Sequence, residues 1–192
     1  VIENLDLPIL YSVPLALRRQ ENSAQKETVA RRAAGLVGDG ATIFIDASST
    51  AGRVVKYLGG LHNIKIITNG LGVLEEASKT VDTVWSTGGR FLRENRAFAG
   101  AEAEKFVRTL NIDLLFFSSE AISEEGEISD SSERETSLRR ALLERAGRRV
   151  FLCDSSKIGR RRMFRLCGRD EVDDIICDVP LLFEKSSGED TR

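Results

Sequence analysis

Short apolar runs alternate with segments of helical periodicity along most of this chain. The apolar runs predict buried strands over residues 43–45, 64–68, 83–86, 112–117, 150–153 and 174–178. Apolar residues that recur every three or four positions predict helices over residues 23–37, 50–58, 73–79, 100–109 and 133–146. This alternation is typical of an α/β fold, so we predict a mainly parallel, open sheet with helices on both faces.

The N-terminal part of the chain lacks a sustained pattern. Pro8 and Pro14 interrupt helical spacing, so residues 1–23 are predicted to form a lead-in arm that can hold one short strand. The first helix then starts at Ser23, whose hydroxyl can cap it. Because the chain begins with Val1 rather than Met, we expect a fragment or a processed form.

The rest of the chain shows no internal repeat and no clear linker. We therefore expect residues 24–180 to form one domain. Residues 181–192 end in Ser, Gly and acidic residues and are predicted to be a flexible tail. Residues 91–96 follow no period and predict an irregular basic loop.

The helix predicted over residues 133–146 has one apolar and one charged set of positions. Leu138, Ala141 and Leu142 share a face and predict its buried side. The charged set predicts a solvated face with weak ion pairs four residues apart, and its members are Glu133, Glu135, Arg139, Arg140 and Arg145.

Composition narrows the function classes. The 192 residues are 41% hydrophobic and 30% charged, with a net charge of −2, which argues against a chain-wide footprint for nucleic acid. No apolar run approaches the roughly 18 residues of a membrane span, and no signal peptide is visible. Cys153, Cys167 and Cys177 form no CxxC pair, and His62 lies in a glycine-rich turn. We therefore expect a cytoplasmic protein with reduced, buried thiols, an exposed histidine, and neither metal nor cofactor.

Candidate chemistry concentrates where the first predicted strand ends. Asp46, Ser48, Ser49 and Thr50 follow this strand directly and precede a helix. In an open parallel sheet such a turn lies at the carboxyl edge, where free N–H groups and the helix dipole attract anions such as phosphate. Two alternatives stay open: Ser48 or Ser49 only caps the helix, and Asp46 only braces the turn instead of binding sugar hydroxyls.

Three further strand ends carry similar groups. The second strand ends in Thr68, Asn69 and Gly70, the third in a turn with Gly88 and Gly89, and the fifth in residues 154–157, which include Lys157. Since the carboxyl ends of parallel strands share one edge, these four loops are predicted to converge on one ligand at exposed strand exits. Lys157 supplies a point charge for a phosphate or carboxylate, or is an ordinary surface lysine. The glycine pair allows close backbone approach or only turns a corner.

No catalytic constellation is compelling. The only histidine, His62, sits in a turn, so we expect no Ser/His/Asp set, and the carboxylates Asp113, Glu120 and Glu135 are scattered. The basic run at residues 160–162 lacks interleaved aromatic residues, so it indicates a loop that faces a phosphate or a partner more than a nucleic-acid contact.

The order of these motifs from Lys26 to Asp178 resembles the sensor domain of the DeoR family of bacterial transcriptional repressors. The family pattern is matched at Gly40, Asp46, Ser49-Thr50, Thr68-Asn69-Gly70, Gly88-Gly89, Gly100, Ile112-Asp113, Phe116, Gly126, Glu135, Arg139-Arg140, Asp154-Ser155-Ser156-Lys157 and Asp178. The family usually has a glycine where this chain has Ser48, and the Cβ there narrows the approach of a phosphate.

The resemblance implies a function and an architecture. It implies a sensor of a phosphorylated sugar or a related small molecule, which alters repressor activity and forms a dimer or tetramer. It also implies contact with operator DNA only through a winged helix-turn-helix that precedes the sensor domain, and residues 1–192 contain no such pattern. No enzymatic activity follows from it.

The fold of this family is similar to that of ribose-5-phosphate isomerase and of CoA transferases, which leaves an enzyme as the alternative. Glu135 falls near the catalytic glutamate of the isomerase. However, the isomerase has paired aspartates after the fourth strand, where this chain has Ser118-Ser119-Glu120-Ala121. A phosphosugar isomerase-like enzyme is therefore the second hypothesis.

Overall fold

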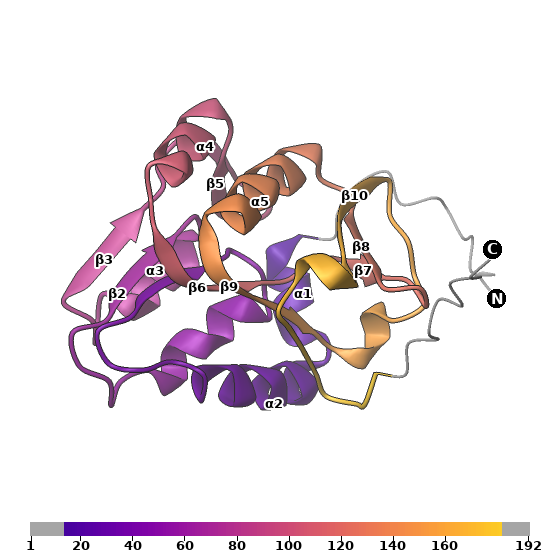
Figure 1. Cartoon of the computed structure of the whole chain (residues 1–192), viewed down its shortest axis with the longest axis horizontal. Coiled ribbons are helices and arrows are strands. Elements are labelled where there is room, and N and C mark those ends of the chain that lie inside the picture. The colour runs from indigo at the N-terminus through magenta and orange to yellow at the C-terminus, as the bar shows by residue number, and fades with distance from the viewer. Residues whose placement is uncertain (1–13, 182–192) are drawn as a thin grey trace, which may run out of the picture.

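The computed structural model describes residues 14–181, and its centre is a six-stranded parallel sheet (Figure 1). The strand order is β11–β9–β6–β1–β2–β3, and every neighbouring pair is parallel. The strands are β1 (Thr42–Ile45), β2 (Lys65–Thr68), β3 (Thr83–Ser86), β6 (Ile112–Phe117), β9 (Ala146–Cys153) and β11 (Asp174–Cys177). The predicted α/β class and all six predicted strands are confirmed, although β9 begins four residues earlier than expected.

Helices cover both faces of this sheet, as predicted (Figure 1). The helices on one face are α2 (Ser23–Ala34), the 3₁₀ helix η1 (Ala51–Tyr57) and α3 (Leu71–Ala77). The helices on the other face are α4 (Ala101–Arg108) and α5 (Glu133–Arg145). The segment predicted as a helix over residues 50–58 is thus a 3₁₀ helix, which suits short connections.

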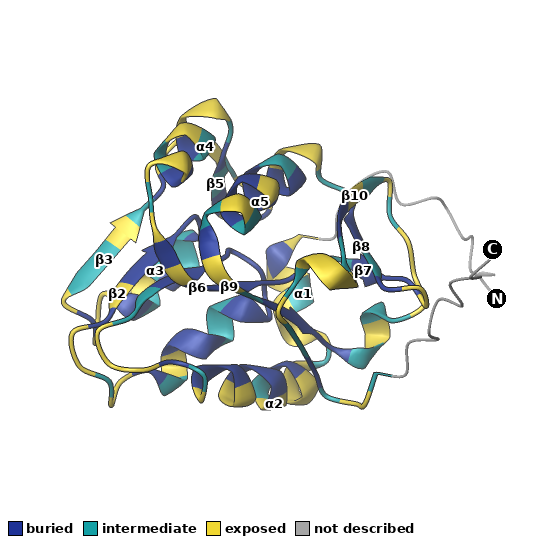
Figure 2. Cartoon of the chain, viewed as in Figure 1, coloured by how far each residue is buried: buried dark blue, intermediate teal, exposed yellow. Residues whose placement is uncertain are grey.

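Alternation within the strands divides the core into two clusters. Ile43 and Ile45 of β1 face α2 and η1, whereas Phe44 between them faces α4 and α5. Figure 2 shows the central strands buried, while the edge strand β3 is only partly covered. Both clusters are closed by apolar helix faces, so the sheet edge with the carboxyl ends of the strands is where polar chemistry gathers.

Two small antiparallel sheets accompany the main sheet. One contains β7 (Ala121–Ile122), β8 (Glu127–Asp130) and β10 (Phe164–Gly168). The other is the hairpin of β4 (Arg90–Leu92) and β5 (Ala97–Ala99). The prediction of an irregular loop over residues 91–96 was wrong for residues 91–92, which belong to β4, whereas residues 93–96 form the turn of the hairpin. The rings of Phe91 and Phe98 pair across the hairpin, with 5.3 Å between their centroids. Strands of three residues are too short to show an alternating pattern, so the sequence did not reveal this hairpin.

The N-terminal prediction needs a correction within the described residues. Leu15–Gln20 form helix α1, and Pro14, which was expected to break helical pattern, stands at its N-cap position. Proline is compatible with a helix start because the N–H groups there have no helical partner. The N-cap of α2 is Asn22 in a left-handed conformation, and not Ser23 as predicted. The predicted arm lies partly, and the tail mostly, outside the described residues.

The solvated face predicted for α5 is also wrong at two positions. Glu135 and Arg139 are each only 5% exposed, whereas Arg140 is exposed. Leu138, Ala141 and Leu142 are buried as predicted. Glu135 and Arg139 lie three or four residues from these apolar positions, so they share the buried stripe of the helix.

The remaining predictions concern cysteine and histidine. All three cysteines are free and buried, as expected, and His62 is exposed beside Asp39. No helix in residues 14–181 is long and apolar enough to cross a membrane.

Candidate functional site

The strands all run in the same direction, but successive strands are added to the sheet first on one side of β1 and then on the other. After β1 the chain runs through β2 to β3 on one side, and then returns to β6, β9 and β11 on the other. The carboxyl ends of β1 and β6 therefore lie side by side at a topological switch point, where open α/β sheets leave a crevice for ligands. Asp46, directly after β1, and Ser118, directly after β6, meet there: the Ser118 N–H donates to Asp46 Oδ2 at 3.3 Å.

The Asp46 carboxylate holds the first loop in place. Its Oδ1 accepts the N–H of Ser48 at 2.9 Å, which forms a tight turn. Ser48 Oγ in turn accepts the N–H of Ala51 at 3.1 Å, at the start of η1. Thr50 is buried, and its hydroxyl has no partner among the described residues. In this structure Asp46 and Ser48 thus brace the loop, as the open alternatives anticipated.

Arg139 of α5 lies behind this loop in a buried charge cluster. Its Nε donates to Asp46 Oδ2 at 2.9 Å and its Nη1 to Asp130 Oδ2 at 3.0 Å, while Nη2 lies 3.6 Å from Glu135 Oε1. Burial disfavours the charged guanidinium, but the three carboxylates outweigh burial and raise the pKa of Arg139. The cluster ties the ends of β1 and β8 to α5.

Glu135 has a second neighbour. Burial, opposed by Arg139, raises the pKa of its carboxyl group. Asn95, from the turn between β4 and β5, donates its side-chain N–H to Glu135 Oε2 and accepts a 2.8 Å bond from Arg18 Nη2. Helix α1 is thereby connected to the charge cluster through Arg18, Asn95 and Glu135.

The loop after β2 packs against the first loop. Asn69 Oδ1 accepts the N–H of Ala47 at 3.0 Å, and the Thr68 hydroxyl donates to Ile45 O at 2.6 Å. Gly70 is needed for this close packing, because a Cβ at that position would lie 2.8 Å from Ala47 Cα. The β1 and β2 loops therefore converge as predicted.

The loop after β3 lies two strands further along the sheet and is separate from the switch point. Gly88 and Gly89 are exposed and have φ of 62° and 97°. A Cβ on Gly89 would lie 2.9 Å from Ala99 O, so this loop is fitted to the β4–β5 hairpin. It adjoins the loop after β2, because the Thr87 N–H donates to Thr68 O at 3.0 Å, but Gly88 and Gly89 turn a corner away from the switch point.

The loop after β9 reaches the switch point through Lys157, in the 3₁₀ turn η2 (Ser155–Lys157). Lys157 Nζ donates to Ser118 Oγ at 2.7 Å. Beside it lies a cleft of about 120 Å³, lined by Arg18, Glu21, Lys26, Ser49, Ser119, Glu120, Lys157 and Arg162. Ser49 and Lys157 are the predicted residues that line this cleft.

Lys26 is the most unusual residue of the cleft. It belongs to the first turn of α2, is only 3% exposed, and donates from Nζ to Arg18 O at 2.6 Å and to Glu21 O at 2.8 Å. Burial lowers its pKa to about 8, and the neighbouring Lys157 adds to this effect. Burial likewise lowers the pKa of Lys157. Among the described residues, neither ammonium forms a salt bridge. The buried carboxylate of Asp154 acts on both and raises their pKa, but burial outweighs it, so both charges stay under-compensated.

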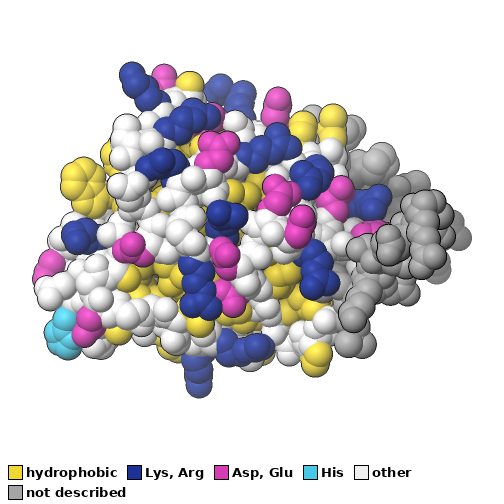
Figure 3. Space-filling view, in the orientation of Figure 1, with side chains coloured by type: hydrophobic (Ala, Val, Ile, Leu, Met, Phe, Trp, Pro, Cys, Tyr) yellow, Lys and Arg dark blue, Asp and Glu magenta, His cyan; other side chains and the backbone are white. Residues whose placement is uncertain are grey.

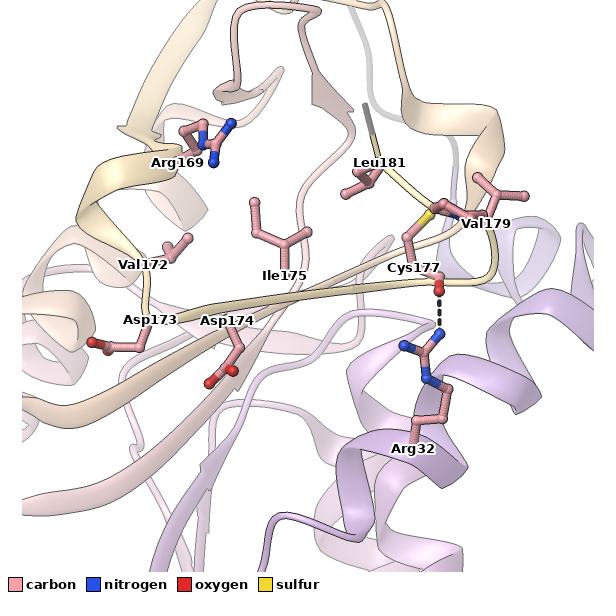
Figure 4. Close-up of a pocket in the computed structure, with 10 residues that line it drawn as sticks. Arg32, Arg169, Val172, Asp173, Asp174, Ile175, Cys177, Val179 and Leu181 are labelled. Atoms are coloured by element: carbon pink, nitrogen blue, oxygen red, sulfur yellow. Dashed lines mark hydrogen bonds between the residues drawn. The ribbon is translucent and has the colours of Figure 1, made fainter. Parts of the chain in front are cut away.

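A larger hollow of about 400 Å³ lies beside β11, at the sheet edge (Figure 4). None of the predicted site residues lines it. Its charged groups already serve the fold: Arg32 donates to Cys177 O at 2.6 Å, Asp173 accepts the Arg149 N–H, and Asp174 pairs with Arg148. We therefore place the candidate site in the smaller cleft at the switch point.

The strand exits were predicted to be exposed, and this was wrong for the loops after β1 and β2, whereas Gly88 and Gly89 are exposed and Lys157 is half-buried. Asp46, Ser48, Ser49, Thr50, Thr68 and Asn69 are all buried. Arg18 of α1 and Glu21 of the connection to α2, together with the segments that precede β7 and β10, supply walls that the sequence did not reveal.

Sequence reasoning also missed Lys26 and Arg139, although a signal was present. Lys26 lies three, four and seven residues before the buried Val29, Ala30 and Ala33, so a lysine occupies the apolar stripe of α2. Arg139 occupies the equivalent stripe of α5. A charged residue on a core-facing stripe is costly without a partner and marks a position worth testing.

The face of the molecule shown in Figure 3 displays no basic surface among the described residues. On the face in Figure 3, basic and acidic side chains are interspersed rather than gathered into a basic surface. Within residues 14–181, no group of three or more His, Cys, Asp or Glu side chains is arranged to hold a metal ion.

Curated relatives of this chain are transcriptional regulators. The chain is 33% identical over 167 residues to the transcriptional repressor AccR of Agrobacterium fabrum, covering 86% of this chain and 65% of AccR. It is 31% identical over 166 residues to the L-fucose operon activator of Escherichia coli, covering 86% of this chain and 68% of the activator. It therefore spans about two thirds of the length of these relatives.

A solved structure and a family model complete the comparison. Ribose 5-phosphate isomerase A of Methanocaldococcus jannaschii superposes with a TM-score of 0.53 at 19% identity, over 72% of this chain and 55% of the isomerase. At this identity the similarity establishes the fold alone. The model of the DeoR C-terminal sensor domain matches residues 21–179. This chain therefore belongs to the family of DeoR C-terminal sensor domains.

Proposed function

We propose that this chain is the sugar-phosphate-sensing domain of a cytoplasmic, DNA-binding transcriptional repressor. One observation carries the proposal: Lys26, which is buried, and Lys157, which is half-buried, place two ammonium groups without salt bridges in a cleft at the switch point. A phosphate would neutralise both, and charge-assisted hydrogen bonds of this kind are the strong ones. The sugar effector is suggested by the relative that is an activator of the L-fucose operon.

The ligand is expected to lie across the mouth of the switch point. Its phosphate would face Lys26 and Lys157, with the hydroxyl of Ser49 as a further donor, because the Ser119 hydroxyl already donates to Ser129 O. Glu120, held by Ser131 at 2.6 Å and by Arg162 at 3.3 Å, is an acceptor for sugar hydroxyls. The mixture of cations, hydroxyls and the two carboxylates of Glu21 and Glu120 suits a phosphorylated polyol better than a plain carboxylic acid.

A thermal-shift experiment tests this assignment. Phosphorylated sugars should raise the melting temperature, and the matching free sugars should do so far less. A ligand at ~100 times its dissociation constant adds about 2.7 kcal/mol, which for a domain of this size corresponds to roughly 5–10 °C. A panel of sugar phosphates that gives no shift would refute the proposal.

Two substitutions locate the site. Lys157→Ala removes a charge, and a hydrogen bond to a charged group contributes about 1.5–3 kcal/mol, so affinity should fall roughly tenfold or more. Thr50→Val tests whether the unpartnered Thr50 hydroxyl donates to the ligand. Arg161→Ala is the control, because Arg161 is exposed and pairs with Glu125 outside the cleft. If both site variants respond as the wild type does, the assignment to these residues fails.

The enzyme alternative is disfavoured by the placement of its key groups. Glu135 faces Arg139 and Asn95 in the buried cluster and does not line the cleft, and serines follow β6 where the isomerase has aspartates. We expect no aldose–ketose interconversion of sugar phosphates. Turnover that Glu135→Gln abolishes would overturn the sensor in favour of the enzyme.

The proposed repressor would read paired DNA sites as a symmetric oligomer. We expect this chain to form a dimer or tetramer, and expect no specific operator binding by residues 1–192 alone. Light scattering that gives a strict monomer at high concentration would count against the first expectation, and nanomolar, sequence-dependent DNA binding against the second.

A further inference from the structure

Helix α1 forms one wall of the cleft, although little apolar surface holds it there. It is six residues long, Leu15 is its buried residue, and Leu17 is 54% exposed. A helix this short is not stable on its own in water, so its position depends on contacts to the rest of the domain. Segments with few buried apolar contacts open at low free-energy cost.

Polar contacts from the body hold α1 at both ends. At its start, Leu15 N–H donates to Glu94 O at 3.1 Å. At its end, Lys26 Nζ donates to the carbonyl oxygens of Arg18 and Glu21, and Arg53 Nη2 donates to Arg19 O at 2.7 Å. The cations that complete the C-terminus of α1 therefore come from other elements.

Lys26 belongs both to this contact and to the cleft. An ammonium group has three donors, and Lys26 uses two of them on α1 and its following turn. The third donor remains for a ligand in the cleft, which Lys26 lines. Arg18 and Glu21 line the same cleft from the α1 side, with Arg18 Nη2 held by Asn95 at 2.8 Å. A bound anion would thus be shared between α1 and the body of the domain.

We propose that an anion bound in the cleft clamps α1 onto the domain by bridging Arg18 of α1 to Lys26 and Lys157 of the body. This proposal rests on the proposed function and adds its regulation. The empty cleft leaves α1 in equilibrium with an open position, and occupancy shifts that equilibrium toward the closed position.

Hydrogen exchange of the full 192-residue chain tests the clamp, with inorganic phosphate as the probe. The exchange of backbone amides over residues 15–22 is measured with phosphate and with chloride at equal ionic strength. At phosphate near ten times its dissociation constant, exchange at α1 should slow about tenfold, by mass action on the closed state. Amides of α4, on the far face of the sheet, should change less than about twofold.

Arg18→Met separates the clamp from a merely structural role. The ratio to compare is the exchange rate of α1 in chloride divided by its exchange rate in phosphate. If Arg18 had only a structural role, Arg18→Met would raise the exchange rate of α1 in chloride but leave this ratio unchanged. The clamp predicts that the ratio falls to about one, while phosphate still raises the melting temperature through Lys26 and Lys157. Lys105→Met, an exposed lysine of α4, is the charge-matched control and should keep the full ratio.

The outcomes distinguish the two proposals. Thermal stabilisation by phosphate without slower exchange at α1 overturns the clamp and leaves the sensor site standing. A full ratio in Arg18→Met also overturns the clamp. If phosphate neither stabilises the chain nor slows α1, both proposals fail. Slowing at α1 that depends on Arg18 supports the clamp.

Discussion

Two groups of buried charge lie on either side of the loop after β1, and they are built in opposite ways. Around Arg139, one cation faces the three carboxylates of Asp46, Asp130 and Glu135, at 2.9 to 3.6 Å. In the cleft, the ammonium groups of Lys26 and Lys157 donate to carbonyl and hydroxyl oxygens, and neither forms a salt bridge within the described chain. We call the Arg139 cluster closed because its cation is paired with carboxylates, and we call the cleft open because its two lysines have no salt bridge.

The difference separates a structural role from a binding role. Attraction to its carboxylates keeps Arg139 charged and raises its pKa despite burial. Burial without a paired carboxylate lowers the pKa of both lysines, so their charged form is destabilised until an anion arrives. Closed clusters fix loops in place, and under-compensated charges in a cleft favour ligand binding.

The closed cluster should dominate stability, and removing its cation should have the largest effect. Arg139→Met leaves three buried carboxylates without their cation, which should lower the free energy of unfolding by about 3–5 kcal/mol. Urea denaturation measures the loss. Arg140→Met, one residue further along the same helix but exposed, is the matched control and should cost less than ~1 kcal/mol. A loss below ~1 kcal/mol for Arg139→Met would contradict the comparison.

The open cleft should show its character in the pH dependence of binding. Burial lowers the pKa of Lys26 to about 8, so above that pH the empty cleft must take up a proton before it can pair with an anion. Affinity for a sugar phosphate should therefore fall about tenfold for each pH unit between ~8 and ~10. The charged groups that act on Lys26 are Asp154, Lys157, Arg53 and Glu21. Isothermal calorimetry across this range checks the slope, and a flat profile would argue against a role for Lys26.

In the absence of ligand, the same lysine should make the domain more stable as the pH rises, which is opposite to the pH dependence of binding. Its pKa is lower in the folded state than the ~10.4 of an unfolded chain, so the unfolded chain binds more protons between pH ~8 and ~10.4. Stability contributed by this group is therefore lowest below pH 8 and rises as pH increases through that window. The difference in unfolding free energy between wild type and Lys26→Met, followed from pH 7 to 10, should become more favourable to the wild type.

The smallest expected effect is the change in the stability of the domain when Lys157, the other lysine of the cleft, is substituted. Lys157→Met keeps the length of the side chain and removes a desolvated charge, so the free energy of unfolding should change by less than ~1 kcal/mol. Affinity for phosphate should nevertheless fall, as for Lys157→Ala. A loss of 3 kcal/mol or more on denaturation would place Lys157 with Arg139, as a structural cation.

The sequence by itself determined the α/β class, the six strands and the order of the polar loops. Apolar runs such as 112–117 and the amphipathic periodicity of the helices are local patterns, and burial in the sheet and its helices acts on those same residues. The loops after β1 and β2 could be paired because parallel strands share an edge. The family resemblance, confirmed over residues 21–179, rests on the same ordered motifs.

Only the tertiary structure decided which strand ends meet. The strand order puts β6 and β9 beside β1 and carries β3 two strands away, so Lys157 joins the site while Gly88 and Gly89 do not. Tertiary packing also turned two charged helix positions inward, Lys26 toward the carbonyls of α1 and Arg139 toward three carboxylates. Such partners come from segments up to 93 residues apart in the sequence. Whether a buried charge meets an opposite charge is decided only when these segments pack together, so no local pattern of residues predicts it.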